Sequence, residues 1–275
     1  MASIDQLFDK THLMPTIPKV VQELIDSFSN ENIDVESIAK KVGMDQVLTA
    51  KVLRLANSSY YGLQRQIGSV DEAIVVMGLN SLRTLVVATG VTGAFAPITG
   101  FDRTRFWKRS LLVAAYCRWL GKKTKQNPEI AFTAGLMHAI GEVLIHLAKP
   151  AEAESIDHRV LAGERRIELE RNELGFTHCE VGTELARRWN FPTAIQQSIA
   201  FYDAPLASDP IVPLAALVHI ATYLENGLSK GQEHEELLAN FPTAVGEVLH
   251  LEIDGLIDEL PPIGEMSAGL ESFMG

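Results

Sequence analysis

The stretch Phe132–Ile145, with the sequence FTAGLMHAIGEVLI, carries the strongest indication of how this chain folds. Its apolar residues recur at helical spacing, which predicts a buried helix over about 129–147. His138 lies on or beside the buried face of that helix. Gly135 and Gly141 flank the histidine, and residues without a side chain allow a neighbouring helix to come close.

The composition is that of an ordinary globular protein. Of 275 residues, 47% are hydrophobic and 21% are charged. No continuous apolar run approaches the ~18 residues of a membrane span, and the acidic start MASIDQLFDK lacks the apolar region of a signal peptide. We therefore expect a cytoplasmic protein without a membrane segment. Its two cysteines, Cys117 and Cys179, suit a reducing compartment.

Negative charge is concentrated at the C-terminal end. The formal net charge is −11, and ten acidic residues but no Lys or Arg follow Lys230. Residues 1–230 are thus close to neutral, which argues against a general attraction to nucleic acid. The acidic end could dock on a basic helix face of the same or another subunit.

Nearly every segment has the periodicity of a helix, and none shows the alternation of a strand. This predicts an all-α protein. The glycines and Pro97 within Gly90–Asp102 indicate a linker. We expect an N-terminal helical subdomain over 1–97, a helical core over 98–230 and an acidic helical extension over 231–275. Pro261, Pro262 and nearby glycines suggest that the last residues are loosely held.

Three N-terminal motifs and the His138 segment resemble the HDOD (HD-related output) domain, a regulatory branch of the HD phosphohydrolase superfamily. The motifs are LMPTIPKVVQEL at 13–24, DQVLTAKVLRLANSSYYG at 45–62 and IGSVDEAIVVMGLNSLR at 67–83. The resemblance covers roughly residues 13–225. It implies an N-terminal helical bundle packed on an HD-like helical core, and a bacterial regulatory role.

The resemblance also locates the positions of the metal site found in catalytic HD proteins. Those proteins place a His-Asp pair and further histidines and an aspartate around a divalent ion. In this chain the matching, vestigial positions are Arg109, His138, Ala139, His178, Phe201, Tyr202 and Thr222. Only the two histidines survive. Hydrolysis at a bound metal needs at least three ligands and an open position for water, so we expect no metal, no cofactor and no catalytic residue.

Other readings of the same residues are less favourable. His138, Glu142 and His146 share one helix, but the outer two lie about 12 Å apart along its axis, too far for one ion. Cys179 follows His178 directly, and adjacent helical residues point about 100° apart, so they do not form a nucleophile–base pair. We expect a buried, hydrogen-bonded His138 and a buried Cys179.

A helix-turn-helix outline occurs at 38–56, but its second helix begins with Met44, Asp45 and Gln46 and carries few cations. Recognition helices present basic and polar groups to bases, so we do not expect this segment to bind DNA. A basic cluster lies further along, and a solvated helix face explains most of it. Arg105, Lys108 and Arg109 are the candidate contacts for a phosphate or an acidic partner. The whole cluster is Arg103, Arg105, Lys108, Arg109, Arg118, Lys122, Lys123 and Lys125.

These observations favour a non-catalytic signalling protein that acts by binding a protein partner through a degenerate HD core. Two alternatives remain open at this point. One is a metal-dependent phosphohydrolase with an atypical ligand set. The other is a receptor that binds a phosphate-bearing, nucleotide-like ligand beside Arg109.

Overall fold

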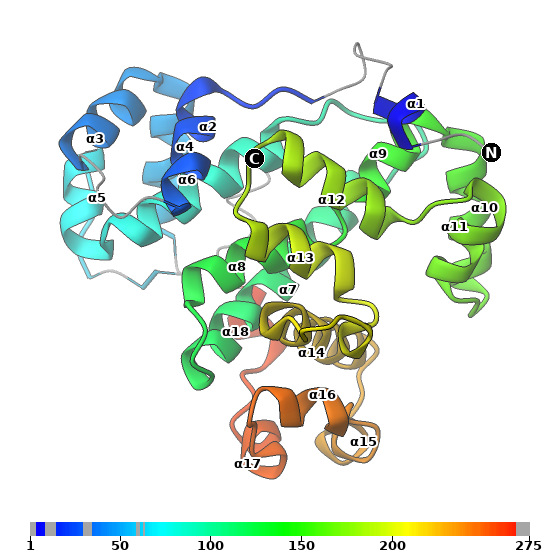
Figure 1. Cartoon of the computed structure of the whole chain (residues 1–275). Coiled ribbons are helices and arrows are strands. Elements are labelled where there is room, and N and C mark those ends of the chain that lie inside the picture. Colours follow the sequence, from blue (N-terminus) through cyan, green and yellow to red (C-terminus); the bar gives the residue numbers. More distant parts are fainter. Residues whose placement is uncertain (1–3, 9–14, 30–34, 59–60, 63, 268–275) are drawn as a thin grey trace.

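The computed structural model describes residues 4–8, 15–29, 35–58, 61–62 and 64–267, and within them every regular element is a helix. The all-α prediction is confirmed. Figure 1 shows two groups of helices, the N-terminal bundle and a larger core, with α15, α16 and α17 below that core and α18 beside α7.

The N-terminal bundle consists of α2 to α6, which gather on one side of the molecule in Figure 1. Asp45 and Ser69 cap two of its helices by accepting hydrogen bonds from the backbone N–H of Leu48 and Glu72. The helix α1 lies apart from this bundle, where the Phe8 ring stacks under the Arg188 guanidinium of the core at 4.4 Å. The bounds are α1 Ile4–Phe8, α2 Lys19–Asp26, η2 Ser27–Ser29, α3 Val35–Met44, α4 Gln46–Ala56, α5 Val70–Met77 and α6 Leu79–Gly93.

The core is built around α7 and α8, which pack along each other, with α14 on α7 and with α12 between α9 and α13. Close packing of α7 and α8 depends on Gly135, where an added Cβ would lie 2.8 Å from the backbone of Ala114. The bounds are α7 Arg103–Lys123, α8 Pro128–Met137, α9 Ile140–Ala148, α10 Pro150–Leu161, α11 Arg166–Leu174, α12 His178–Arg188, α13 Thr193–Phe201, η3 Pro205–Ala207 and α14 Pro213–Ser229.

The C-terminal extension packs against α14 and α7 rather than hanging free. The Tyr116 hydroxyl on α7 donates to the carbonyl of Pro261 at 3.1 Å, and Lys123 pairs with Glu259. The expected loose end is therefore wrong as far as Ser267, and part of the acidic stretch does dock on α7 of the same chain. Its helices are α15 His234–Ala239, α16 Thr243–Val248, α17 Ile253–Asp258 and α18 Ile263–Ser267.

Two helices expected to be continuous are broken. The helix expected over 129–147 is interrupted at His138 and Ala139, where the Ala139 backbone (φ −107°, ψ 13°) leaves helical geometry and begins α9. The segment expected over 150–173 is divided by a turn containing Gly163, whose φ of +102° ends α10. Conversely, α6 continues through Gly90 and Gly93, so the irregular connection spans only residues 94–102.

The stretch Pro128–Ala148 is long and apolar enough by composition alone to cross a membrane, contrary to our expectation that no segment is. Within the fold, however, 89% of its most apolar window is buried. Contacts with neighbouring helices thus account for its hydropathy.

The crossing of α9 and α12 determines where the two surviving histidines lie. At Gly141 an added Cβ would stand 2.0 Å from the carbonyl oxygen of His178 and 2.8 Å from the backbone nitrogen of Gly182. Both neighbours are backbone atoms, so neither can move aside without displacing a helix. Only glycine fits at this contact.

We therefore expect Gly141→Ala to lower the free energy of unfolding by at least about 1–3 kcal/mol, as overpacking does. Gly43→Ala is the matched control, because Gly43 is also helical and an added Cβ there meets nothing within 4 Å. That change should be neutral or stabilise by up to about 1 kcal/mol. Urea unfolding followed by circular dichroism measures both, and equal stabilities for the two variants would contradict the close contact.

Candidate functional site

His138 lies at the break between α8 and α9 and is almost fully buried. Its Nδ1 lies 2.6 Å from the carbonyl oxygen of Gly135, one of the carbonyls left free where α8 ends. Nδ1–H is therefore the donor, which makes Nε2 the acceptor. That Nε2 atom is buried and has no hydrogen-bond partner. Burial, with the positive charge of Arg109, lowers the pKa of His138 to about 3, so this imidazole is neutral.

His178 has both ring nitrogens occupied by protein groups. The Glu170 carboxylate accepts from Nδ1–H at 2.7 Å and from the backbone N–H of the same histidine at 2.8 Å. Nε2 lies 2.6 Å from the hydroxyl of Tyr202. Burial opposes the charged form, but Tyr202, Cys179 and Glu170 together raise the pKa of His178 well above its usual value. This imidazole is therefore charged and donates at both nitrogens.

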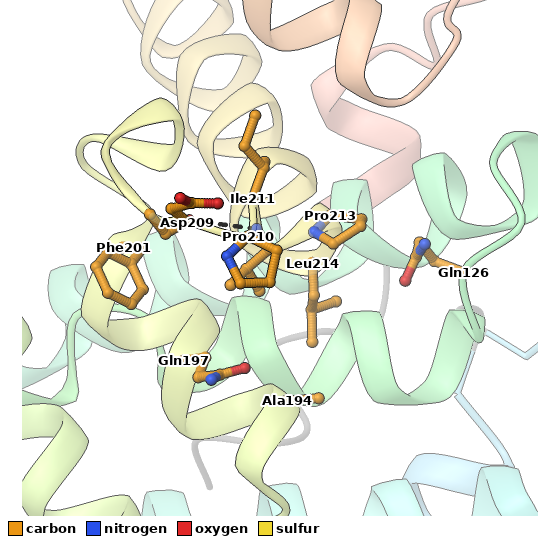
Figure 2. A pocket seen from close by; sticks show the side chains of 11 residues that line it. Gln126, Ala194, Gln197, Phe201, Asp209, Pro210, Ile211, Pro213 and Leu214 are labelled. Carbon is orange, nitrogen blue, oxygen red and sulfur yellow. Dashed lines mark hydrogen bonds between the residues drawn. The ribbon is translucent and has the colours of Figure 1, made fainter.

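Tyr202 joins the two histidines. While its hydroxyl meets His178, its ring lies edge-on to the ring of His138 with centroids 5.1 Å apart. Phe201, the preceding residue and the last of α13, instead lines a hollow on the surface (Figure 2). The two positions that match a histidine pair in the HD pattern thus have different surroundings.

Arg166 on α11 is the hub of a second set of contacts that the sequence did not reveal. Its guanidinium lies 3.7 Å from a carboxylate oxygen of Glu142 on α9 and 3.6 Å from one of Glu170, and it donates to Asp157 on α10. Burial would raise the pKa of Glu142, but the charge of Arg166, followed by those of His178 and Arg109, holds that pKa below its usual value. One cation therefore holds three helices together.

Arg109 on α7 faces Glu225 on α14, with Nε 3.5 Å from Oε2. Glu225 is one helical turn beyond Thr222, the position where the resemblance leads one to look for an aspartate. Thr222 itself only donates to the carbonyl of Val218 in its own helix, at 2.9 Å. The fold thus retains a buried carboxylate on α14, displaced by one turn, which the sequence comparison had missed.

The basic cluster divides between buried and exposed side chains. Arg118 is buried against Glu129, and Arg103 donates to the carbonyl of Thr92 at 2.9 Å, so neither belongs to a solvated face. Arg105 and Lys108 are exposed. They remain the candidates for contact with a phosphate or an acidic partner.

The remaining candidates, His146 and Cys179, make structural contacts only. His146 does not share a site with His138, because both of its ring nitrogens are engaged elsewhere. Its Nε2 pairs with Asp157 at 2.9 Å, and its Nδ1 with the carbonyl of Glu142. Cys179 is buried, as expected, and its Sγ lies 3.7 Å from a histidine nitrogen that the Tyr202 hydroxyl already occupies at 2.6 Å. Neither geometry prepares a nucleophile.

These residues do not fit the divalent ion of catalytic HD proteins. Among the residues that the structure describes, no three His, Cys, Asp or Glu side chains are grouped so that they could hold a metal. Of the two surviving histidines only His138 offers a free nitrogen lone pair, because His178 is engaged at both. Arg109 also brings a fixed positive charge to the position.

A surface hollow of about 380 Å³ lies beside this centre, between α13 and the segment that leads into α14 (Figure 2). Its floor is largely apolar, and Gln126, Gln197 and Asp209 supply polar groups at its edge. The hollow shares Phe201 with the vestigial positions but contains neither histidine. It is lined by Gln126, Ala194, Gln197, Phe201, Ser208, Asp209, Pro210, Ile211, Val212, Pro213 and Leu214.

The helical fold, with two histidines at the junctions of central helices, defines the class of HD-like helical proteins. The HDOD domain model matches residues 14–205, and the chain belongs to that family. A crystal structure of the "putative phosphohydrolase" of Shewanella amazonensis is 32% identical, with a TM-score of 0.84 and 98% of each chain covered.

More distant relatives extend beyond this chain. A "putative signal transduction protein" of Marinobacter aquaeolei is 20% identical, with a TM-score of 0.75, and shares the fold over 98% of this chain and 59% of its own. A protein of Treponema pallidum is 26% identical over 235 residues, which are 83% of this chain. The match spans 45% of that protein's length, so the chain corresponds to about half of it.

The opposite pKa shifts of the two histidines predict how stability depends on pH. His178 keeps its proton above the unfolded value of 6.5, so its contribution is present below pH 6.5 and is lost as the pH rises through the folded pKa. His138 has a folded pKa of about 3, so the unfolded chain takes up its proton first and stability falls between pH 6.5 and 3. The two terms together place the maximum near pH 6.5.

Nitrogen-15 chemical shifts of the imidazoles test this assignment directly. Between pH 5 and 7.5 we expect one unchanging neutral ring for His138 and one unchanging charged ring for His178. Titration of either ring near pH 6.5 would contradict the geometry.

Proposed function

We propose that this HDOD protein is a non-catalytic regulatory protein of bacterial signalling that acts by binding a protein partner. The observation that carries the proposal is His178, whose two ring nitrogens both meet protein groups, Glu170 and Tyr202. An imidazole engaged in this way has no lone pair for a metal. The side chains of the centre thus support each other rather than a substrate.

The charge pattern supports the same conclusion. A metal-dependent phosphohydrolase needs an open coordination position for water, whereas Arg166, Glu142 and Glu170 close the centre with mutual ion pairs. The name of the Shewanella relative favours the alternative of an atypical phosphohydrolase. A test must therefore separate binding from hydrolysis. The cytoplasmic location remains a prediction.

Metal content and hydrolysis test the absence of catalysis. For protein purified without chelator we expect Fe, Mn and Ni far below one equivalent, and hydrolysis of bis(p-nitrophenyl) phosphate at the rate of buffer alone. His138→Ala is the control and should give the same background. Stoichiometric metal, together with a hydrolysis rate that His138→Ala abolishes, would establish the phosphohydrolase instead.

Capture of a partner tests the proposal that the protein acts by binding another protein. Cross-linking in native cells should join wild-type protein and the His138→Ala variant to the same partner with equal yield, because the centre is not the contact surface. Mass spectrometry identifies the partner, and reciprocal capture with that partner confirms it. Capture that is lost in the His138→Ala variant would show that the centre itself is used.

A further inference from the structure

Among the residues that the structure describes, three carboxylates are buried in the core: Glu142, Glu170 and Glu225, with Glu170 fully inaccessible. A buried carboxylate is stable as an anion only when a cation or several hydrogen-bond donors compensate it. In a metalloprotein the ion supplies much of that compensation. The cations that face these three carboxylates therefore show which groups of the protein compensate their negative charge.

The protein supplies as many cationic groups as there are buried carboxylates. Arg166 lies 3.7 Å from Glu142 and 3.6 Å from Glu170, and the imidazole of His178 donates to Glu170 at 2.7 Å. Arg109 lies 3.5 Å from Glu225. The centre is therefore compensated without any added ion.

Arg109 reaches this centre from the solvent side. Its side chain is 40% exposed, whereas the side chain of its partner Glu225 is only 5% exposed. The Ser229 hydroxyl donates to the other oxygen of Glu225 at 2.7 Å and fixes the carboxylate. Arg109 Nε, Glu225 Oε2 and His138 Nε2 are all buried atoms without a hydrogen bond. The arginine charge also lowers the pKa of both His138 and Glu142.

We propose that the Arg109 guanidinium is a built-in cation of this centre, held by Glu225, that stands in the place expected for a divalent ion. The buried carboxylate on α14 and the free nitrogen of His138 then form the inner side of a cation site that an arginine already fills. This goes beyond the proposed function, because it states that Arg109 occupies the cation position and must be removed before another cation can bind there.

Variants at position 109 test the proposal through thermal stability. Arg109→Ala should lower the melting temperature, because Glu225 is left buried and unpaired. Arg109→Lys should retain most of the stability, since it keeps the charge. Arg105→Ala is the matched control, an exposed arginine one turn earlier on α7, and should leave the melting temperature unchanged.

Rescue of Arg109→Ala by an added cation is a second test. It is not expected if Arg109 only packs against its neighbours. Methylguanidinium at millimolar concentration should stabilise Arg109→Ala saturably, with an apparent affinity at least tenfold above any response of wild type or Arg105→Ala. Mn²⁺, tested separately, should stabilise neither this variant nor wild type, because the described residues include no group of three metal ligands. In Arg109→Ala with Glu225→Gln the response to methylguanidinium should vanish.

Three outcomes would overturn the proposal: Arg109→Ala as stable as wild type, equal loss in Arg109→Lys and Arg109→Ala, or no rescue of Arg109→Ala by methylguanidinium. If Arg109→Ala does not fold, the proposal is tested with the double variant that also carries Glu225→Gln, because removing both charges should restore folding. A double variant that stays unfolded would also overturn it. Rescue is measured without substrate or partner, so its failure is distinguishable from failure of the proposed function.

Discussion

The close approach of α9 and α12 at Gly141 is the constraint on which the centre depends. Because the backbone of His178 lies against Gly141, the first turn of α12 is held against the start of α9, just after the α8–α9 break. That contact places His178 within reach of Glu170 on α11 and of Tyr202, the residue that follows α13. A side chain at position 141 would separate these helices, and the hydrogen bonds of His178 would be lost with them.

Charge compensation is the second organising feature, and it acts between helices rather than along one. Arg166 connects α9, α10 and α11 through Glu142, Asp157 and Glu170. Buried ion pairs contribute little net stability relative to apolar packing, but breaking one leaves an uncompensated charge that costs several kcal/mol. Such a network specifies the arrangement of helices more than it stabilises it. A core of this kind agrees with the proposed function, in which the protein presents a surface to a partner.

Helical periodicity predicted the all-α class and most elements, because it depends only on local spacing. It did not predict the break at His138, since the same apolar pattern continues through 138 and 139 and only the packing of α9 on α12 requires a change of direction. Gly90 was read as part of a linker for a similar reason. In the fold it lies inside α6, where an added Cβ would be 2.5 Å from the Val21 side chain. A glycine that permits helix contact and a glycine that ends a helix look alike in sequence.

The centre was predictable only in part. The resemblance located the histidines at 138 and 178, but it did not reveal that Glu170 and Tyr202 hold His178. Arg166 and Glu225 matched no motif. Glu170 follows Arg166 by four residues in a helix rich in charge, which reads as a solvated pair. The Glu170 carboxylate is buried only because the fold places His178, the first residue of α12, against it.

Glu225 shows most clearly why motif positions and physical roles separate. The motif points to Thr222, yet a carboxylate one turn later on the same helix face reaches the same side of the core, since residues three apart are neighbours on a helix. Once Arg109 provides a cation of fixed charge on a long side chain, its partner need not coincide with a metal ligand; it has only to lie within reach of the guanidinium. The exchange of a metal for an arginine therefore relaxes the geometry at position 222 while it keeps the requirement for a buried anion nearby. A cation and a buried anion thus face each other in the centre although position 222 carries no carboxylate.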